Sequence, residues 1–272
     1  MQMIALPHLS AVRFSGVDAG DFLHNQLSAD VLALSTGEST FACYCEPKGR
    51  VLSLMLVCRI DDAFYVIMSS PLASPVADRL KIYVMRAKVV IELMTVTVAG
   101  GQVSGEQQAS TDTAFIIPAP DSDRCFALVS GEDGAEINVP AQNAWKTWEL
   151  QRGITWLSRK SSGEFLPQML GFDQLGAVNF RKGCYPGQEI VARTHYLGKV
   201  KRHPRILTTS AVICPAPLEQ LKILRGDESY KAVIVDCAHH DNGSSCLFAV
   251  TRMDPDLIAD NIEYHGQIAP LV

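Results

Sequence analysis

The sequence of 272 residues has no apolar run long enough to cross a bilayer. Its longest run, VLSLMLVCRI from Val51, contains Ser53 and Arg59 and suits a buried strand instead. The N-terminal segment lacks a basic region followed by a long apolar core, so we expect no secretory signal. Positive charge is not in excess, because 24 Lys and Arg stand against 29 Asp and Glu. We therefore expect a cytoplasmic protein that binds neither a membrane nor nucleic acid directly.

Several common cofactor and metal motifs are also missing. No GxGxxG follows a predicted strand and no GxxxxGK[ST] is present, so the sequence gives no support for a nucleotide-phosphate site. Cys43 and Cys45 form CxC instead of the CxxC of a zinc site. The polar run from Cys237 to Asp241 is followed by Asn242-Gly243, which predicts a hairpin turn and explains the polarity. We expect no metal site, and reduced thiols instead of a disulfide framework among the 8 cysteines.

The hydrophobic pattern predicts an α+β fold. Apolar residues recur at helical spacing in three stretches: 18–31, 71–86 and 142–151. Strand-like apolar runs lie between them: 51–60, 63–69, 88–93, 96–100, 114–120 and 125–131. The succession of strand, strand, helix and strand begins a split β-α-β arrangement. From Pro204 onward the pattern changes to short alternating strands with turn signals, which predict a small β-barrel or sandwich.

The stretch Arg181–Arg202, RKGCYPGQEIVARTHYLGKVKR, carries the strongest candidate for chemistry. Cys184 lies between two glycines and close to a proline, and these residue types predict a tight, shaped turn. Lys182 and the N-terminus of a helix expected at the second glycine would both favour the thiolate of Cys184. The residues alone leave two interpretations open, a functional thiol and a small buried hydrophobe.

The residues around Cys184 have structural explanations as well as functional ones. Glu189 falls in the first turn of the expected helix, where it favours the helix dipole or pairs with Arg193. A Cys–His pair with His195 or His203 is a further option, although the sequence identifies no Asp or Asn to orient the imidazole. Basic residues of this region form either a solvated face or a site for an anionic ligand. They are Arg193, Lys199, Lys201, Arg202 and Arg205.

At KGCYPGQEIVAR the chain resembles the YgfZ family of folate-binding proteins, which are relatives of the glycine-cleavage T-protein (aminomethyltransferase) in the GcvT superfamily. That family carries the motif K-G-C-[FY]-x-G-Q-E, which the chain matches from Lys182 to Glu189. FSGVDAGDFLHNQLSADV, EPKGRVLSLMLV, FLPQML and VARTHYLGKVKR are similar to further segments of the family. The resemblance covers most of residues 10–205.

The resemblance implies an α+β fold in which a three-lobed, GcvT-like ring surrounds a central hole for tetrahydrofolate. Split β-α-β (ferredoxin-like) lobes and a small C-terminal β-barrel would make up the ring. The domain ranges that we expect are a discontinuous folate-binding lobe of 1–42 and 96–204, an inserted α+β lobe of 43–95, and the β-barrel at 205–272.

The resemblance further implies a tetrahydrofolate-binding accessory protein for iron–sulfur cluster assembly or repair. It would support cluster-dependent enzymes, including those that modify tRNA, and its partners would be folate and iron–sulfur proteins or their assembly machinery. We expect a monomer. The site residues assigned in this way are Cys184 as the functional thiol, Lys182 beside it and, for folate, Tyr185, Gln188, Glu189, Arg193, Arg202 and Trp148.

The chain departs from the T-protein pattern at two places. T-proteins have an acidic pair, one member of which helps catalysis, in the segment where this chain has Ser53 and Leu54. They have Asp at the position of Cys184. Both differences argue against aminomethyl transfer on folate, which remains the alternative function, and leave open whether the chain is an enzyme. The segment ELQRGI is a looser match to the family's arginine-and-glycine segment, because Glu149 stands where Arg is usual, and this weakens the case for a folate contact there. A scaffold with a vestigial pocket is the third interpretation.

Overall fold

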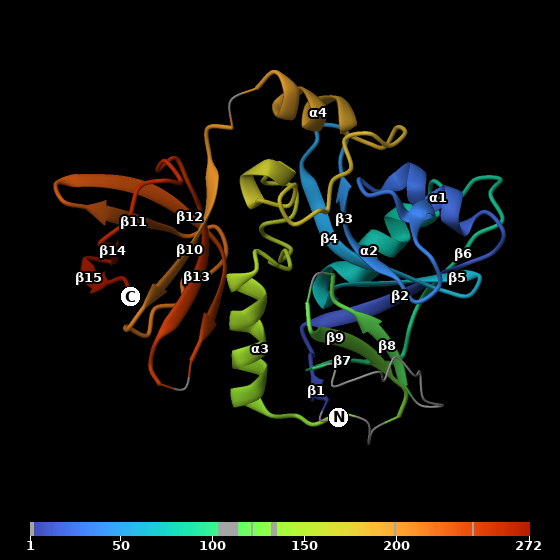
Figure 1. Cartoon of the computed structure of the whole chain (residues 1–272), viewed down its shortest axis with the longest axis horizontal. Coiled ribbons are helices and arrows are strands. Elements are labelled where there is room, and N and C mark those ends of the chain that lie inside the picture. The colour runs from blue at the N-terminus through green and yellow to red at the C-terminus, as the bar shows by residue number, and fades with distance from the viewer. Residues whose placement is uncertain (1–2, 103–113, 121, 132–134, 199, 241) are drawn as a thin grey trace.

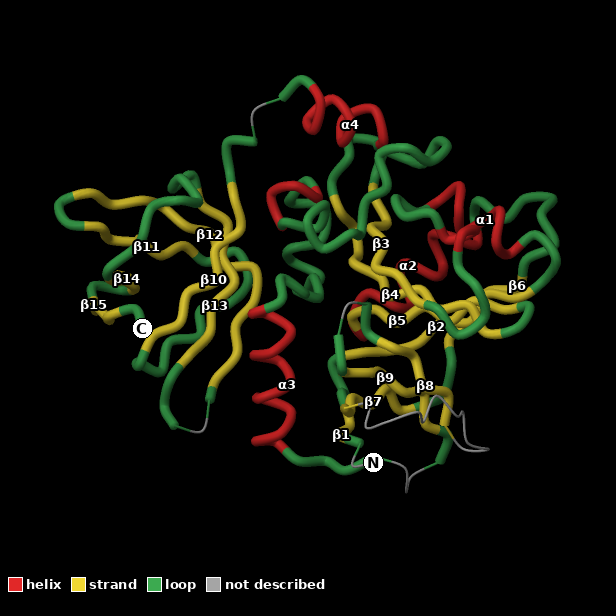
Figure 2. Tube along the Cα trace, viewed as in Figure 1, coloured by secondary structure: helices red, strands yellow, loops and turns green. Residues whose placement is uncertain are grey.

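The computed structural model describes residues 3–102, 114–120, 122–131, 135–198, 200–240 and 242–272. Lys199 and Asp241 lie outside these ranges. The described residues form three antiparallel sheets with helices packed on and between them, which confirms the α+β class (Figure 1). Strands and loops make up most of the trace, and helix α3 lies between the C-terminal sheet and the other two sheets (Figure 2). No helix within the described ranges is long and apolar enough to cross a membrane.

The first sheet has five strands in the order β3-β4-β5-β2-β6. Its elements are β2 (Leu9–Ser15), β3 (Ser39–Cys45), β4 (Val51–Ile60), β5 (Ala63–Ser69), β6 (Val90–Leu93), α1 (Ala19–Gln26) and α2 (Ser70–Lys81). Helix α1 follows β2 and α2 follows β5. The predicted split β-α-β arrangement is therefore confirmed by β2, α1, β4, β5, α2 and β6, with β3 added at the edge beside β4.

Both helices of this lobe end earlier than the hydrophobic pattern predicts. Helix α1 ends at Gln26 because Leu27 adopts an extended conformation, and a short 3-10 turn, η1 (Val31–Ala33), follows. The predicted N-cap Asp18 does not cap the helix with its side chain. Its Oδ2 accepts a hydrogen bond of 2.6 Å from the backbone N–H of Lys88, which ties the start of α1 to the approach of β6.

The second sheet has four strands in the order β1-β7-β9-β8. Its elements are β1 (Ile4–Ala5), β7 (Thr97–Gln102), β8 (Ala114–Pro118), β9 (Arg124–Val129) and the helix α3 (Val139–Gln151) that packs on it. Helix α3 begins three residues before the predicted stretch because Asn138 Oδ1 accepts a hydrogen bond of 3.0 Å from Ala141 N–H. A Cβ at Gly100 would lie 2.7 Å from the Trp145 ring, so this glycine lets α3 approach β7 closely.

The third sheet is formed by the C-terminal residues and confirms the all-β tail. Its strands are β10 (His203–Thr209), β11 (Gln220–Arg225), β12 (Glu228–His239), β13 (Ser245–Thr251), β14 (Asn261–Tyr264) and β15 (Gln267–Pro270). Their order is β10-β13-β12-β11-β14-β15. A bridge between Thr209 and Leu271 joins the ends of the two edge strands, so the sheet curls on itself. The predicted turn at Gly243 lies between β12 and β13.

The expected domain ranges stay a prediction, and the hydrogen-bonded sheets follow a different grouping. The first sheet takes β2 from 1–42 and β4 to β6 from 43–95, and β3 (Ser39–Cys45) crosses the boundary between the two ranges. Strand β1, also from the first range, pairs with β7 of the second sheet. The N-terminal residues therefore contribute strands to both sheets and hold them side by side.

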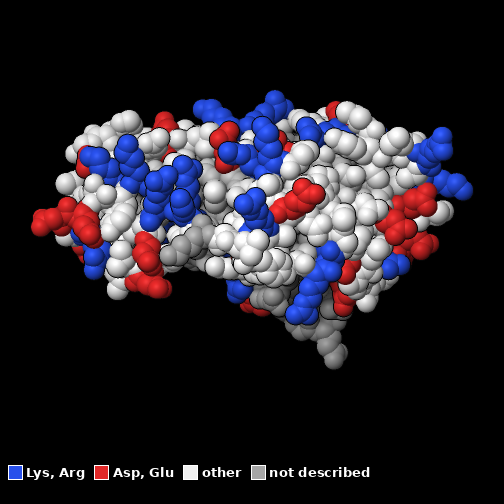
Figure 3. Space-filling model, turned by 90° about the horizontal axis from the view of Figure 1, so that it is seen from above, with Lys and Arg blue, Asp and Glu red and all other residues white. Residues whose placement is uncertain are grey.

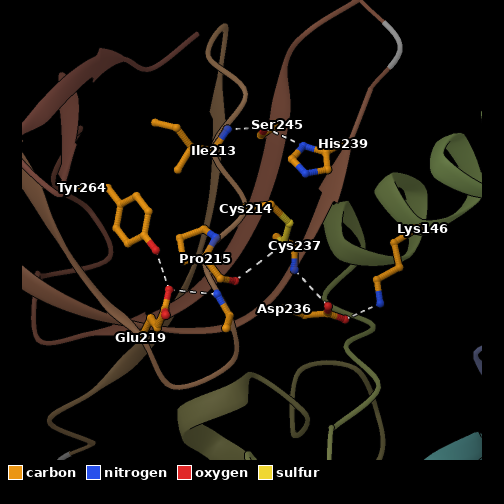
Figure 4. Close-up of a disulfide and its surroundings, with 11 residues drawn as sticks. Lys146, Ile213, Cys214, Pro215, Glu219, Asp236, Cys237, His239, Ser245 and Tyr264 are labelled. Carbon is orange, nitrogen blue, oxygen red and sulfur yellow. Dashed lines mark hydrogen bonds and ion pairs between the residues drawn. A yellow bond between two sulfur atoms is a disulfide. The ribbon is translucent and has the colours of Figure 1, made fainter.

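The expectation of reduced thiols is wrong for one pair of cysteines. Cys214 and Cys237 form a disulfide in the C-terminal sheet, with Cα atoms 5.7 Å apart (Figure 4). The remaining cysteines are free. The two residues are 23 positions apart in no recognisable motif, and they meet because the loop before β11 passes over β12. Next to Cys237, Asp236 forms an ion pair of 2.6 Å with Lys146 of α3, which ties this sheet to the helix.

Candidate functional site

The segment that contains Cys184 is held in a tight turn by its own residues. Asn179 Oδ1 accepts hydrogen bonds from the backbone N–H groups of Arg181 (2.8 Å) and Lys182 (3.1 Å). Gln188 Nε2 donates to the carbonyl oxygen of Lys182 at 3.3 Å. We call residues 181–187 the motif loop. Its shape is set by an Asn turn at one end and by the first helical residue at the other.

Lys182 anchors the motif loop to the N-terminal lobe. The side chain is buried, and Nζ donates to the carbonyl oxygen of Leu27 at 2.6 Å and to that of His24. These carbonyls belong to the C-terminal end of α1, where a cation is favoured by the helix dipole and satisfies carbonyls without helical partners. The ammonium also lies 5.3 Å from the centre of the Tyr185 ring. Lys182 therefore holds the loop against α1.

Burial gives Lys182 a measurable pH signature. It lowers the pKa of Lys182 from the ordinary 10.5 to about 8, although the nearby charges of Asp30 and Cys184 oppose this. The unfolded chain then binds more protons than the folded one between about pH 8 and 10.5. We expect the unfolding free energy of the wild type, minus that of Lys182→Met, to be constant below pH 8. Above pH 8 it should rise by up to about 1.4 kcal/mol per pH unit.

Urea unfolding between pH 7 and 10 measures this difference. Lys231→Met, which changes an exposed lysine of β12, is the control and should give a difference that does not vary with pH. A flat profile for Lys182→Met as well would show that the ammonium is not desolvated in the folded chain.

Cys184 is the exposed thiol of the motif loop, whereas the other free cysteines are buried. Burial raises the pKa of the thiols of Cys43 and Cys58 to about 12, so these groups stay protonated at neutral pH. Because a thiolate is the reactive form and must be accessible, Cys184 is the free thiol placed to react with a partner molecule. Of the two interpretations left open by the sequence, the exposed position favours a functional thiol.

Tyr185 is buried next to Cys184, and its burial raises the pKa of the phenol. Gly187 follows with φ of 83°, the left-handed conformation that favours glycine. A Cβ on Gly187 would lie 2.6 Å from the Cα atom of Gly49 and closer still to the carbonyl oxygen of Glu46. The turn EPKGR, which also resembled the family, therefore packs directly against the end of the motif loop.

Helix α4 (Gln188–Tyr196) begins where the sequence predicts, with Gly187 at its N-cap. Val191 is its buried residue, and the carbonyl oxygen of Val191 accepts a hydrogen bond of 2.8 Å from Gln168 Nε2. Gln168 belongs to the 3-10 helix η2 (Pro167–Leu170), which is the FLPQML segment. Within the described ranges the expected ion pair between Glu189 and Arg193 does not form, and both side chains are exposed.

His24 is a neighbour of the motif loop that the sequence did not point to. A Cβ on Gly183 would lie 3.8 Å from His24 Nε2, and His24 Nδ1 lies 3.2 Å from Asp30 Oδ1. Burial and the nearby Lys182 ammonium lower the pKa of His24. The histidine with a carboxylate partner beside the loop is thus His24. His195, one of the two predicted candidates, stacks on Phe180 with ring centres 3.8 Å apart.

A cavity of about 580 Å³ lies between α3, η2 and the first strand of the C-terminal sheet. Residues from distant parts of the chain line it, among them Phe41, Trp148, Arg152, Gln174, Pro204 and Arg205. Arg124 lies over the Trp148 ring at 4.6 Å and Arg152 at 5.8 Å from its centre. The cavity therefore offers one indole ring with guanidinium groups around it.

Arg205 brings a further guanidinium to this cavity. Its Nη2 atom donates to the carbonyl oxygens of Asp254 (2.7 Å) and Leu257 (2.5 Å), which fixes the side chain. Its Nε atom is buried and has no hydrogen-bond partner among the described residues. A buried donor without a partner costs free energy, so a polar ligand group in the cavity would be well placed to satisfy it.

The structure separates the predicted site residues into two groups. Trp148 lines the cavity. Arg202 and the predicted residues of the motif loop and of α4 do not line it. The 3-10 helix η2 connects the two places, because Leu170 lines the cavity while Gln168 bonds α4. The roles of Tyr185, Gln188, Glu189, Arg193 and Arg202 toward folate stay predictions.

Arg152 was not predicted from the sequence as a residue of the cavity, and Arg205 was predicted only as part of a basic cluster. Trp148 and Arg152 are four residues apart at the end of one helix, a spacing that puts two side chains on the same face. That spacing was the signal that could have found Arg152. No sequence pattern predicted Phe41 as a residue of the cavity, because it reaches the lining only through the packing of β3 in the folded chain.

Glu149, which stands where the family usually has Arg, is fully buried beneath the cavity. Its Oε1 atom accepts hydrogen bonds from Trp145 Nε1 (3.0 Å) and Trp156 Nε1 (2.8 Å), and Oε2 lies 3.4 Å from His8 Nε2. The carboxylate joins two indole rings behind Trp148 and does not line the cavity. Glu149 thus supports the wall that carries Trp148.

The fold defines the class of protein to which this chain is similar. Over 99% of its length it matches the glycine cleavage system aminomethyltransferase T of Bartonella henselae, covering 84% of that chain with a TM-score of 0.74 and 12% identity. The expected GcvT-like fold is therefore confirmed. No family model matches the chain.

Sequence comparison identifies the family within that class. The chain is 28% identical over 287 residues to the tRNA-modifying protein YgfZ of Klebsiella pneumoniae, which covers 95% of this chain and 88% of that protein. It is 30% identical over 203 residues, 74% of its length, to an uncharacterized protein of Haemophilus influenzae, of which it covers 71%. The resemblance to the YgfZ family that the motif predicted is therefore confirmed over nearly the whole chain.

Proposed function

We propose that the chain binds tetrahydrofolate in the cavity beside Trp148 and serves as an accessory protein for iron–sulfur proteins, with Cys184 as its functional thiol. The observation that carries the proposal is the cavity itself, in which an indole ring and two arginines converge in a fold shared with an aminomethyltransferase. The Klebsiella relative is named a tRNA-modifying protein, which supports tRNA-modifying enzymes as the cluster-dependent enzymes that the chain would assist.

The cavity suits a reduced folate in size and chemistry. Its volume of about 580 Å³ lies in the range typical of sites for small organic ligands. Trp148 offers an aromatic surface for a flat ring, and guanidinium groups bind carboxylates through paired, charge-assisted hydrogen bonds. Arg152 and Arg205 are therefore the residues that would hold the glutamate end of the ligand, and Arg205 Nε would gain the partner that it lacks.

The position of Cys184 supports a role toward a protein partner. Cys184 is exposed on the motif loop and does not line the cavity, so the thiol is accessible from solvent while folate occupies a different site. Folate would then act as a structural or sensing ligand. The thiol would carry the chemistry with the iron–sulfur protein.

The alternative, aminomethyl transfer on folate, has less support. Acyl and amino group transfers need a positioned acid or base, and carboxylates commonly supply it. None of the described residues that line the cavity is Asp or Glu. Ser53, which stands in the segment of the T-protein acidic pair, is buried and donates from Oγ to the Leu54 carbonyl oxygen at 3.0 Å.

Equilibrium binding of tetrahydrofolate to the purified chain, measured by calorimetry under anaerobic conditions, tests the proposal. We expect saturable binding with one site, and a dissociation constant raised at least about tenfold in Arg152→Met through loss of a charge-assisted contact worth about 1.5–3 kcal/mol. Arg86→Met, which changes an exposed arginine outside the cavity lining, is the matched control and should bind as the wild type does.

Two outcomes would contradict the proposal. Binding that is absent or no tighter than millimolar would favour a scaffold with a vestigial pocket. Turnover of an aminomethyl donor by the purified chain with tetrahydrofolate would favour the transferase.

The same calorimetric measurement on Arg193→Met reports whether the arginine of α4, which the sequence assigned to folate, contributes to folate binding.

A further inference from the structure

Helix α4, which begins four positions after Cys184, and the turn after it present apolar side chains to solvent. Val191 is the residue that α4 buries, whereas Ile190 is 40% exposed, Tyr196 63% and Leu197 84%. A helix that buries so little of its surface gains little stability from packing. A cluster of exposed apolar residues on one element is typical of an interaction site.

Contacts with neighbouring rings hold the aromatic part of this apolar cluster in a fixed geometry. The ring of Phe180 stacks on that of His195 with centres 3.8 Å apart. The Tyr196 ring meets both nearly at right angles, at 6.1 Å from Phe180 and 4.7 Å from His195. Aromatic side chains that are already ordered lose little conformational entropy on binding, so the surface is prepared for a partner.

Positive charge surrounds the cluster, although the chain as a whole carries a net charge of −5. Residues 181–202 contain six Lys and Arg and a single acidic residue, Glu189. Seen from above, Lys and Arg side chains gather over the middle of this face and over the C-terminal sheet (Figure 3). Four exposed members form no ion pair with the described residues: Arg181, Arg193, Lys201 and Arg202.

We propose that this α4 surface, made of Ile190, Tyr196 and Leu197 with the four basic residues around them, is the docking site for an acidic protein. The inference rests on the proposed function, since the acidic partner would be the iron–sulfur protein or assembly factor that Cys184 serves. An apolar centre with a charged rim is the anatomy of a protein interface, and arginine and tyrosine are enriched in such interfaces. The basic rim favours a partner that carries carboxylates on its surface and raises the rate at which the two proteins associate.

The apolar centre favours a protein over a nucleic acid as the occupant. Phosphates would satisfy the basic rim, but they would leave Ile190 and Leu197 without apolar contacts. Cys184 precedes α4 by four positions, so a partner seated on the helix would lie next to the thiol. Docking on α4 would thus bring the partner's cluster or sulfur ligands to Cys184 without contact with the folate cavity.

The test uses the full chain in cells that lack the wild-type copy, with the activity of a cluster-dependent tRNA-modifying enzyme as the readout. We expect Leu197→Asp to lower that activity at least about fivefold, since a carboxylate at the centre repels an acidic partner and removes apolar contact. Ile258→Asp is the matched control, because Ile258 is 81% exposed in the loop between β13 and β14 and should tolerate the change. Unchanged activity in Leu197→Asp would overturn the inference.

A second measurement identifies the kind of occupant. A photo-crosslinking residue at position 197 should give adducts that protease removes and ribonuclease does not, and Arg193→Glu with Arg202→Glu should abolish them. Adducts that ribonuclease removes, or a yield that the charge reversal leaves unchanged, would overturn the acidic-protein proposal.

The outcome for Cys184→Ala separates this inference from the proposed function. If that variant keeps full activity, the thiol function fails. If it loses activity while Leu197→Asp keeps it, only the docking surface fails. Tetrahydrofolate binding to purified Leu197→Asp should equal that of the wild type, which shows that the variant is folded.

Discussion

Replacing Cys184 by alanine is expected to reduce the activity of cluster-dependent enzymes in cells to the level found without the chain. Cys184 is the exposed free thiol, and the other free thiols are buried. Buried thiols such as Cys43, whose pKa is raised to about 12, cannot replace it as a nucleophile or ligand. The loss should be complete because, among the free thiols of the described residues, Cys184 is the exposed one.

The variant should remain as stable as the wild type within about 0.5 kcal/mol, since exposed side chains away from caps and cores contribute little. Urea unfolding of the purified variant checks this point. Cys184→Ser is the sharper variant, because it keeps the size and polarity of the side chain and removes only the thiolate. Full activity with serine would show that the loop acts by shape alone, and alkylation of the native wild type should modify this one cysteine.

The second large effect is expected in stability. Gly187→Ala should lower the unfolding free energy by about 4 kcal/mol, because φ of 83° strains an alanine and its Cβ would press on the Gly49 backbone, 2.6 Å away. The backbone of a tight turn cannot move aside as a flexible side chain would. Urea or thermal unfolding measures the loss.

Gly176→Ala provides the matched control for this change. Gly176 has a similar φ of 77°, but a Cβ there would meet nothing within 4 Å. It should cost about 1 kcal/mol through the left-handed conformation alone. Equal losses in the two variants would mean that the contact between the motif loop and the turn at 46–49 adds nothing to stability.

The arrangement of the first lobe could be predicted because local patterns decide it. The apolar runs at 51–60 and 63–69 predicted the strands β4 and β5, which pair as a hairpin. The ends of the helices could not be predicted. Helix α1 ends before Leu27, whose carbonyl oxygen accepts a hydrogen bond from Lys182 Nζ. Because Lys182 lies in a distant part of the chain, no local sequence pattern predicts this end of the helix.

The two halves of the candidate site differ in the same way. The motif loop was predictable, since two glycines, a proline and a helix start within one short stretch indicate its shape. The cavity was not, because Phe41, Trp148 and Arg205 meet there only after three sheets have packed. The disulfide between Cys214 and Cys237 was missed for the same reason, since the strand β12 brings the pair together.

The contact between Lys182 and the end of α1 joins residues 155 positions apart. The turn at 46–49, which receives Gly187, also lies far upstream. During synthesis on the ribosome both supports leave the exit tunnel long before the motif loop does. Cys184 is therefore synthesised after the segments that support it, and a chain whose N-terminal lobe is damaged would not hold the motif loop in its folded position.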